Sequence, residues 1–267
     1  MSFLSGVPPL DQPVPDQIRE AAHGLAIHPV WINEVGGSTF RLGEGPQARY
    51  AKWAPVGSGL DLAGEAARLR WAGTYVSVPR VLEVGADDEG AWLVTAAIPG
   101  DMAATDRWKQ EPATAVRVIG EALRIFHDAL PVGECPFSAS AEERVAEAEQ
   151  NAARLENRTF HPDYGHLSPA QALKRVAADI PPVDKLVVCH GDTCAPNTLL
   201  TADGGFAGHV DLGQLGVADR WSDLAVATWS TTWNYGAGWE EPLLDAYGIA
   251  PDPERTDYYR LLWSVGP

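Results

Sequence analysis

A short stretch of the chain concentrates residue types that can carry out phosphoryl transfer. It reads VVCHGDTCAPNTLL over residues 187–200, and it places His190, Asp192 and Asn197 directly after an apolar run that is typical of a strand. Asp211 follows in a second strand-like segment, GHVDLG. In phosphoryl transfer one carboxylate orients the attacking hydroxyl, while an amide oxygen and a second carboxylate hold Mg²⁺ on the nucleotide phosphates. The residue types and their order therefore favour this chemistry.

Each of these residues also has a structural explanation. Asp and Asn are common in loops because they form local turns, and His190 is expected to stabilise the loop. The combined pattern H-G-D-x-x-x-x-N followed by V-D-x-G favours the functional interpretation, because it rarely arises by chance. A metallohydrolase site built on His190, Asp192 and Cys194 is disfavoured, since the sequence offers no distant third ligand with suitable spacing.

A nucleotide-dependent transferase also needs a cation on the phosphates, and Lys52 lies in a strand-like run, RYAKWA. The next predicted helix begins after Asp61, and its Leu62, Glu65 and Leu69 share one face. An unpaired carboxylate on an apolar face is costly to bury, so Lys52 on the adjacent sheet is the expected partner of Glu65. A surface position for Glu65 is the alternative.

The segment EVGGSTF, residues 34–40, precedes Lys52 and has two interpretations. Gly36 and Gly37 would let backbone N–H groups approach phosphate oxygens closely, as in a phosphate-covering loop. An ordinary hairpin turn has the same composition. The sequence leaves both interpretations open.

The elements that position these residues change in character along the chain. Residues 1–98 contain short strand-like segments bounded by Gly, Pro or Asp, with one helix, DLAGEAARLRWAG, among them. The strand-like segments are HPVWINEVGGSTFRL, QARYAKWAP, PRVLEVG and AWLVTAAIPG. Residues 99–267 are predicted to be mostly helical, so the fold class is α+β with an N-terminal sheet crossed by a helix.

Three helical segments are predicted in the second region. Residues at three- and four-residue steps form one apolar stripe: Val116, Ile119, Leu123, Phe126 and Leu130. A second stripe comprises Val145, Ala148, Ala152 and Leu155, and the solvated face beside it carries Glu142, Glu143, Glu147 and Glu149. A third helical run begins near Asp219.

Composition restricts the partners. With 36 acidic and 20 basic residues the net charge is −16, which argues against nucleic acid and favours the approach of cationic ligands. The three cysteines form neither a disulfide framework nor a zinc spacing. We expect a cytoplasmic protein that does not bind membranes, because the chain shows neither a signal peptide nor a membrane-spanning apolar run. We also expect a monomer.

Taken together, these residues resemble the aminoglycoside phosphotransferase family, which shares the two-lobed protein-kinase-like fold. The resemblance covers most of the chain. It is carried by the segments YAKWAP, GEAARLRW, WLVTAAIPG, CPF, VVCHGD and DLGQLGVADRWSDLA. The resemblance implies an N-terminal nucleotide-binding lobe in residues 1–98, with an antiparallel sheet, and a catalytic and substrate-binding lobe in residues 99–267.

The same resemblance implies roles for single residues and the cofactors ATP and Mg²⁺. Asp192 would be the catalytic aspartate, with Asn197 and Asp211 as Mg²⁺ ligands. Lys52 would contact the α- and β-phosphates while paired with Glu65. Further expected nucleotide contacts are Ser38 in the nucleotide loop and a hinge from Thr95 to Ala97 that hydrogen-bonds adenine. Asp223 would brace the catalytic loop, and Asp219 would cap the helix that carries it.

Within the family, the chain looks most similar to streptomycin 3″-phosphotransferases, through residues 157–164 (NRTFHPDY) and the C-x-P-N form of the loop. The implied function is MgATP-dependent phosphorylation of an aminoglycoside, which confers resistance. A cationic sugar calls for carboxylates and aromatic faces. The candidates are Asp163 and a cluster that contains Trp233, Tyr235, Trp239 and Glu240.

Three alternatives remain. Kanamycin and neomycin 3′-phosphotransferases are the nearest, although their characteristic acidic-aromatic tail differs from RLLWSVGP here. A kinase of another small amino sugar or alcohol would use the same phosphate machinery. A nucleotide-binding pseudokinase is disfavoured, because such proteins typically lose the lysine or a metal ligand and this sequence has both.

Overall fold

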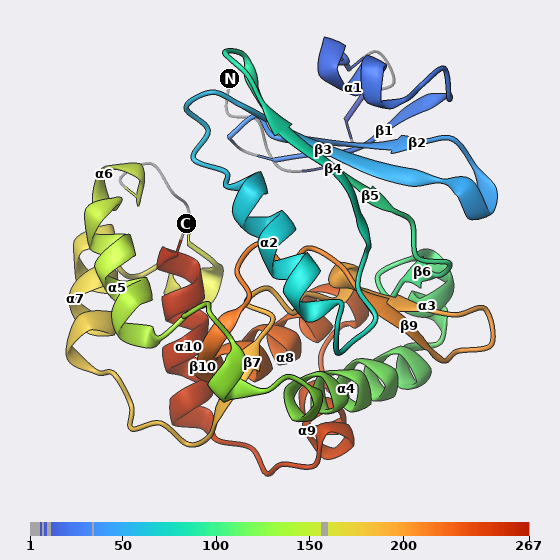
Figure 1. Cartoon of the computed structure of the whole chain (residues 1–267). Coiled ribbons are helices and arrows are strands. Elements are labelled where there is room, and N and C mark those ends of the chain that lie inside the picture. Colours follow the sequence, from blue (N-terminus) through green and yellow to red (C-terminus); the bar gives the residue numbers. More distant parts are fainter. Residues whose placement is uncertain (1–5, 7, 10–11, 34, 156–159, 267) are drawn as a thin grey trace. The chain divides into compact units, whose positions relative to one another are not determined.

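Figure 1 shows the computed structural model of the chain, which describes residues 6, 8–9, 12–33, 35–155 and 160–266. The chain forms two compact units. Unit 1 contains the residues up to Pro99 together with Ala207–Gly213, and unit 2 contains Gly100–Phe206 and Gln214–Pro267. None of the helices in the described ranges has the length and apolar content needed to span a bilayer.

Unit 1 is built on an antiparallel sheet with the strand order β1-β2-β3-β5-β4. Its elements are α1 (Asp16–Ala21), β1 (Ile27–Ile32), β2 (Ser38–Leu42), the 3₁₀ turn η1 (Gly45–Gln47), β3 (Arg49–Pro55), α2 (Leu62–Ala72), β4 (Val81–Ala86) and β5 (Gly90–Ala96). The predicted N-terminal antiparallel sheet with a helix is confirmed. The sequence did not indicate α1, which spans only six residues.

The two helices of unit 1 cover opposite faces of its sheet, as Figure 1 shows. Successive strand residues point to opposite faces. Ala51 and Val94 point to the face where Ile18 of α1 packs, and all three side chains are buried together. Lys52 and Leu93, each one position along the strand, therefore point to the face that α2 covers.

Ala207–Gly213 joins unit 1 although it lies more than a hundred residues away in sequence. Ser77 holds this segment at two points, because its carbonyl accepts from His209 N–H (3.1 Å) and its hydroxyl donates to Ala207 O (2.7 Å). Position 208 leaves little room for a side chain, because a Cβ atom there would lie 2.7 Å from the Ile98 Cδ1 and 3.0 Å from Ser77 O. These contacts bring Asp211 into the unit that contains Lys52.

Unit 2 is mostly helical, as predicted, and contains two small antiparallel strand pairs, β7 with β10 and β6 with β8. Its elements are β6 (Asp101–Met102), α3 (Asp106–Gln110), α4 (Pro112–Ala129), η2 (Val132–Glu134), α5 (Ala141–Gln150), α6 (Ala152–Leu155), η3 (Pro162–Tyr164), α7 (Pro169–Ala178), β7 (Leu186–Cys189), η4 (Ala195–Asn197), β8 (Thr198–Leu200), β10 (Gly216–Asp219), α8 (Trp221–Tyr235), α9 (Glu240–Tyr247) and α10 (Pro253–Val265). Strand β9 (Phe206–His209) crosses the boundary between the units.

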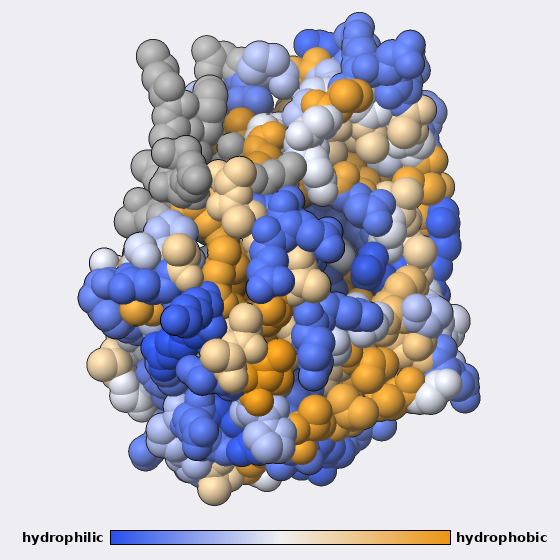
Figure 2. All heavy atoms as spheres, turned by 90° about the vertical axis from the view of Figure 1, so that its left-hand side faces the viewer, coloured by the Kyte–Doolittle hydropathy of each residue, from blue (hydrophilic) through white to orange (hydrophobic). Residues whose placement is uncertain are grey.

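The predicted helical stripes are present with one interruption. All five residues of the first stripe are buried along α4 and at its C-cap. The second stripe is divided at Asn151 between α5 and α6, because α5 ends at Gln150 with Asn151 as its C-cap. The four glutamates beside it are exposed. In Figure 2, hydrophilic and hydrophobic residues are interspersed over the face formed by α5 to α7.

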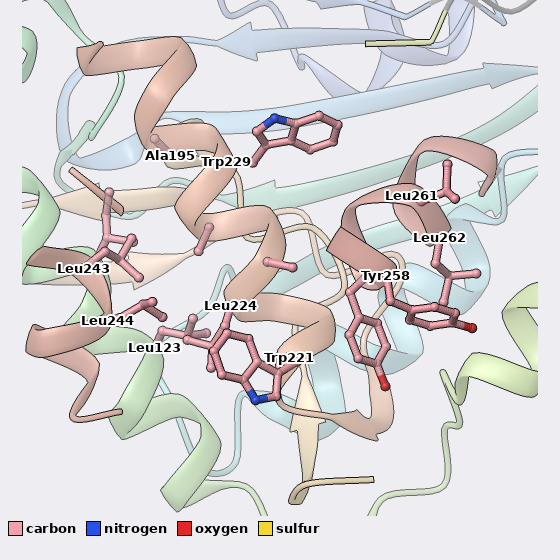
Figure 3. Close-up of a cluster of buried hydrophobic side chains, with 14 of the residues drawn as sticks. Leu123, Ala195, Trp221, Leu224, Trp229, Leu243, Leu244, Tyr258, Leu261 and Leu262 are labelled. Carbon is pink, nitrogen blue, oxygen red and sulfur yellow. The ribbon is translucent and has the colours of Figure 1, made fainter. Parts of the chain in front are cut away.

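The core of unit 2 surrounds α8. Trp221, Leu224 and Trp229 of this helix are buried against α9 and α10, as Figure 3 shows. Tyr258 and Leu262 contribute from α10. Of the residues Trp221 to Thr231, every side chain is buried. Because α8 is enclosed on all sides, the polar residues it carries must find partners inside the unit.

Helices α4 and α9 pack so closely that a glycine is required between them. A Cβ atom at Gly120 would lie 2.6 Å from Leu243 O and 2.8 Å from the Ala246 Cβ. The contact distance is set partly by backbone, which cannot rotate away as a side chain would. The crossing therefore depends on the missing side chain.

We expect Gly120→Ala to lower the free energy of unfolding by about 1–2 kcal/mol, because the overpacking cost exceeds the gain in helix propensity. Chemical denaturation monitored by circular dichroism measures the change. Gly133→Ala is the matched control, since no atom lies within 4 Å of the added Cβ. Equal stability of the two variants would contradict the close crossing.

Candidate active site

In unit 1 one lysine bridges two carboxylates. Lys52 Nζ lies 2.7 Å from Glu65 Oε1 and 2.8 Å from Asp211 Oδ1. Glu65 is only 5% exposed and lies on the buried face of α2 with Leu62 and Leu69, and Asp61 caps this helix by accepting from Gly64 N–H. Lys52 is thus the partner that the sequence predicted for Glu65. Burial opposes the lysine charge, but the attraction of Asp211 and Glu65 raises the pKa of Lys52 above its ordinary value.

Asp211 has an unusual backbone conformation. Its φ angle is +64°, in the left-handed region that few residues other than glycine adopt. Such a conformation costs on the order of 1–3 kcal/mol and tends to persist where function requires it. The side chain of Asp211 is half-exposed, at 49%, although it pairs with Lys52. Its carboxylate is therefore held by a cation and remains accessible to a ligand.

In unit 2 the loop after β7 orders Asp192 and Asn197 against each other. The Asn197 side-chain amide donates to Asp192 O (2.9 Å) and to Asp192 Oδ2 (3.0 Å). The nitrogen of the Asn197 side chain therefore points to Asp192, and its oxygen is the atom that suits a cation. Gly191, with φ +90°, supplies the left-handed turn before Asp192.

A carboxylate on α8 fixes this loop from behind. Asp223 accepts from His190 N–H (2.7 Å) and from Gly191 N–H (2.9 Å), and Thr193 Oγ1 donates to the Asp223 carbonyl (2.7 Å). Burial opposes ionisation, but hydrogen bonds from His127 and the backbone hold the pKa of Asp223 below its ordinary value. The predicted bracing role of Asp223 is confirmed.

Further contacts tie the same loop to α8. Ser230 Oγ accepts from Ala195 N–H (2.8 Å) and from the Asn234 side chain (3.1 Å). His190 is fully buried, its ring lies 6.0 Å from that of Phe126, and its Nδ1 accepts from Asp192 N–H (3.2 Å). His190 therefore has the positional role that the sequence suggested.

Asp219 lies just before α8. Its Oδ1 accepts from Trp221 N–H (2.9 Å) and its Oδ2 accepts from Asp184 N–H (2.6 Å). Helix α8 starts at Trp221, two residues later than predicted. Asp219 thus stabilises the helix start from the preceding turn.

Asp192 and Asn197 in unit 2, and Asp211 in unit 1, each offer carboxylate or amide oxygens, which are the donor types that Mg²⁺ binds. Within the described residues, one cluster of three His, Cys, Asp or Glu side chains is close enough together to hold a metal ion, and it consists of His127, Cys189 and Asp223. These three are occupied by hydrogen bonds, and Cys189 donates to Asp219 O (3.3 Å). The metallohydrolase site on His190, Asp192 and Cys194 is not among these groups.

The expected nucleotide contacts lie in ordered backbone of unit 1. Residues 33–37 form the turn of the β1–β2 hairpin, apart from Glu34, which lies outside the described residues. Gly37 N–H donates there to Asn33 Oδ1 (2.7 Å). Ser38 is buried at the start of β2. Thr95 lies opposite Tyr50 in the sheet, and Ala97 N–H donates to Ala48 O (3.0 Å). The Ala97 amide is therefore already engaged within unit 1.

The expected substrate residues fall into two groups in unit 2. Asp163 adjoins an aromatic group formed by His161, Trp229, Trp233 and Trp263, with ring centroids 4.5–6.2 Å apart. Trp233 is 41% exposed, and its indole N–H donates to His161 Nε2 (3.3 Å). The other ring nitrogen of His161 lies 3.3 Å from Asp163 Oδ2. Residues 157–159 of the segment singled out in the sequence lie outside the described residues.

Glu240 and Trp239 have internal partners instead. Glu240 Oε2 accepts from Arg260 (2.6 Å) and its Oε1 accepts from Thr232 (3.2 Å). Trp239 is the N-cap of α9 and packs against the core. A cavity of about 600 Å³ adjoins Glu240, and its acidic lining residues are Asp163, Glu240, Glu241 and Asp257.

The cavity opens on a different side of α8 from the catalytic loop. Thr228 lines the cavity, whereas Ser230 contacts the loop. At 100° per residue these two side chains point about 160° apart around the helix. Trp233, three residues after Ser230, projects about 60° from it, and Asp163 beside the aromatic group also lines the cavity.

Sequence reasoning did not identify Ser230, His127 or Tyr247 as parts of the site. His127 Nε2 lies 2.9 Å from Asp223 Oδ2, and His127 Nδ1 lies 2.9 Å from the Tyr247 hydroxyl. A histidine next to the apolar stripe of α4 was the available signal, because a buried imidazole needs polar partners. The sequence held no indication that these partners would come from α8 and α9.

Comparisons with known proteins identify the family of the chain. Residues 33–259 match the phosphotransferase enzyme family. An aminoglycoside 3′-phosphotransferase from Streptomyces fradiae is 37% identical over 88% of this chain and 93% of its own length. A streptomycin 3″-kinase from Streptomyces griseus is 36% identical over 86% of this chain and 88% of its own length.

The fold is also that of a solved relative. The structure of aminoglycoside phosphotransferase APH(3″)-Id from Streptomyces rimosus is 30% identical, with a TM-score of 0.81, and the match covers 93% of this chain and 95% of that one. The same protein has been solved in complex with ADP and streptomycin.

The lowered pKa of Asp223 predicts a pH-dependent loss of stability. A carboxylate with a depressed pKa stabilises the fold above its unfolded pKa, about 3.9, and this contribution is lost as the pH falls through the folded pKa. Asp223→Asn removes a charged acceptor of two backbone N–H groups. We expect it to cost at least about 2 kcal/mol at pH 7, with a smaller difference from wild type below pH 4.

Urea denaturation at pH 7, 5 and 3 measures this difference. Asp88→Asn, at an exposed position, is the control and should match wild type at each pH. A difference between Asp223→Asn and wild type that stays constant from pH 7 to pH 3 would refute the assignment of an ionised Asp223.

Proposed function

The chain belongs to the phosphotransferase enzyme family and is an ATP-dependent aminoglycoside phosphotransferase, and from this premise we propose that it phosphorylates streptomycin at the 3″-hydroxyl and so confers resistance. The observation that carries the proposal is the construction of α8. Its last two turns hold the loop of Asp192 through Ser230 and Asn234, and they also carry Trp233 beside Asp163.

In the proposed mechanism, Asp192 accepts a hydrogen bond from the acceptor hydroxyl and takes up its proton as the hydroxyl oxygen bonds to the γ-phosphorus of ATP and the bond from that phosphorus to the leaving ADP breaks. The hydrogen bonds from Asn197 fix the orientation of the Asp192 carboxylate. Asp223 and Ser230 hold the loop in place, so that little reorganisation is needed during the reaction. This leaves position and charge as the main contributions of the protein.

Unit 1 is proposed to bind the nucleotide. Lys52, held in place by Glu65, would contact the α- and β-phosphates, and the Thr95–Ala97 backbone would contact adenine. Asn197 and Asp211 would hold Mg²⁺, which neutralises phosphate charge when it is bound. In the present structure Lys52 pairs with Asp211 directly, so nucleotide and metal would each replace one side of this ion pair.

Asp163 and Trp233 are proposed to bind the cationic sugar. His161 Nε2 accepts from the Trp233 indole (3.3 Å), and His161 Nδ1 accepts from the Asp163 backbone N–H (3.3 Å) and lies 3.3 Å from the Asp163 carboxylate. This arrangement holds a carboxylate at the edge of an exposed aromatic face. A guanidinium group binds such a pair well, through bidentate hydrogen bonds and stacking. Glu240 is proposed to serve through Arg260 rather than by direct contact.

Phosphorylation of kanamycin or neomycin at a 3′-hydroxyl is the second candidate function. It is supported by the 37% identity to the Streptomyces fradiae enzyme, which is as high as the identity to the streptomycin kinase. The machinery around Asp192 would be the same for both acceptors. The distinction therefore depends on the acceptor side.

A substrate panel separates these functions. Purified protein is incubated with MgATP and either streptomycin, kanamycin, neomycin, hygromycin or a simple amino sugar, and ADP release is followed in a coupled assay. We expect turnover with streptomycin and little with the others. Turnover confined to kanamycin and neomycin would establish the second function, and turnover only on a simple sugar would remove the resistance role.

We expect Asp163→Asn to raise the KM for the aminoglycoside about tenfold while the KM for ATP stays within twofold, because one charge-assisted hydrogen bond is lost. Steady-state kinetics with each substrate varied in turn measures both values. Glu241→Gln, which changes a second carboxylate of the cavity that Asp163 also lines, is the matched control and should leave both values unchanged. A rise in the KM for the aminoglycoside in Glu241→Gln but not in Asp163→Asn would contradict the role of Asp163 and assign binding to Glu241.

A further inference from the structure

Three buried polar side chains behind the catalytic loop form one hydrogen-bonded series. His127 of α4 lies between Asp223 of α8 and Tyr247 of α9, with both heavy-atom distances at 2.9 Å. The side chains of His127 and Asp223 are fully buried, and Tyr247 is 1% exposed. No water can therefore substitute for a missing partner without a rearrangement of the core.

The direction of each hydrogen bond follows from the chemistry of the groups. Asp223 accepts from two backbone N–H groups and its pKa lies below the ordinary range, so it is ionised and can only accept. His127 Nε2 must therefore carry a proton and donate to Asp223. In a neutral ring Nδ1 is then an acceptor.

Tyr247 is the group that supplies a proton to this acceptor. Burial raises the pKa of Tyr247 to about 12, so the hydroxyl keeps its proton at neutral pH. The positive charges of Arg220 and Arg124 oppose this rise but do not outweigh burial. The protonated hydroxyl lies 2.9 Å from His127 Nδ1, and its hydrogen is donated to that acceptor.

We propose that Tyr247 is a positioning residue for phosphoryl transfer. By donating to His127 Nδ1 it selects the ring tautomer that donates to Asp223, and this fixes the carboxylate that holds the His190 and Gly191 amides and, through them, Asp192. The proposal goes beyond the proposed function and rests on it only in assigning catalysis to Asp192. It gives α9 a role in the active site although the helix does not contact the loop residues named here.

The packing around Tyr247 suits this role. The rings of His127 and Tyr247 lie 5.6 Å apart in an edge-on arrangement, and the α4–α9 crossing at Gly120 fixes the two helices next to this contact. His127, in the middle of the series, therefore has a partner at each ring nitrogen.

The test is Tyr247→Phe, which keeps the ring and removes the hydroxyl. We expect kcat to fall about tenfold, with the KM values for ATP and for the acceptor within twofold, because the change affects the placement of Asp192 rather than binding. Activity is measured with the acceptor that wild type phosphorylates fastest. Tyr258→Phe is the matched control, since it removes another buried hydroxyl, which donates to Val176 O (3.0 Å). It should lower stability similarly without lowering kcat.

Two further readouts separate positioning from a loss of stability. In ¹⁵N-histidine NMR spectra, with His127 assigned from His127→Gln, we expect the Nε2–H tautomer in wild type and a changed signal in Tyr247→Phe. A glutamine at 127 has an N–H that can donate to Asp223 without a tautomer to select. The double variant His127→Gln/Tyr247→Phe should therefore have the same kcat as His127→Gln alone.

Equal kcat in Tyr247→Phe and Tyr258→Phe, or an unchanged His127 signal in Tyr247→Phe, would overturn the proposal. A failure of the proposed function would give a different result, because the wild-type protein itself would then not phosphorylate streptomycin. The tautomer measurement needs no substrate and would still decide the question about Tyr247.

Discussion

The burial of the Asp223 carboxylate is the constraint on which unit 2 depends. A charge that is removed from water must be satisfied by hydrogen bonds, or the fold loses several kcal/mol. Asp223 meets this demand with the two backbone amides that precede Asp192 and with His127. The requirement of the core for a satisfied carboxylate and the requirement of the site for a fixed loop are therefore met by the same contacts.

Unit 1 solves a similar problem with an ion pair. Glu65 is buried on the apolar face of α2, and Lys52 neutralises it from the sheet that this helix covers. The same lysine also binds Asp211, which reaches unit 1 because Ser77 holds the Ala207–Gly213 segment. Asp211 remains half-exposed. The Lys52 charge that neutralises buried Glu65 is therefore also paired with a carboxylate that a ligand can reach.

The sequence predicted the local parts of this arrangement well. Asp61 as a helix cap, the shared face of Leu62 and Glu65, and the stripe of α4 all follow from spacing that a single element determines. The α+β fold class also followed from the change in texture near Pro99. The division of the second stripe at Asn151 was not predicted, because the apolar spacing continues through the break.

Contacts between distant segments were harder to predict. Nothing near Ser77 in the sequence indicates that residues 207–213 pair with it, and α1 was too short to give a periodic signal. Tyr247 has no motif around it, and its contact with His127 exists only because α4 and α9 cross at Gly120. Among the expected substrate residues, Glu240 pairs with Arg260, a contact that residue type alone does not indicate.

The central claim is that Asp192 carries out the chemistry and that the rest of the site exists to hold it. The most direct measurement is kcat for Asp192→Ala with MgATP and saturating aminoglycoside, beside Asp88→Ala, which changes an exposed aspartate. The account predicts a loss of about 10²-fold to 10⁴-fold for Asp192→Ala and no loss for Asp88→Ala. Turnover of Asp192→Ala within a few-fold of wild type would contradict it.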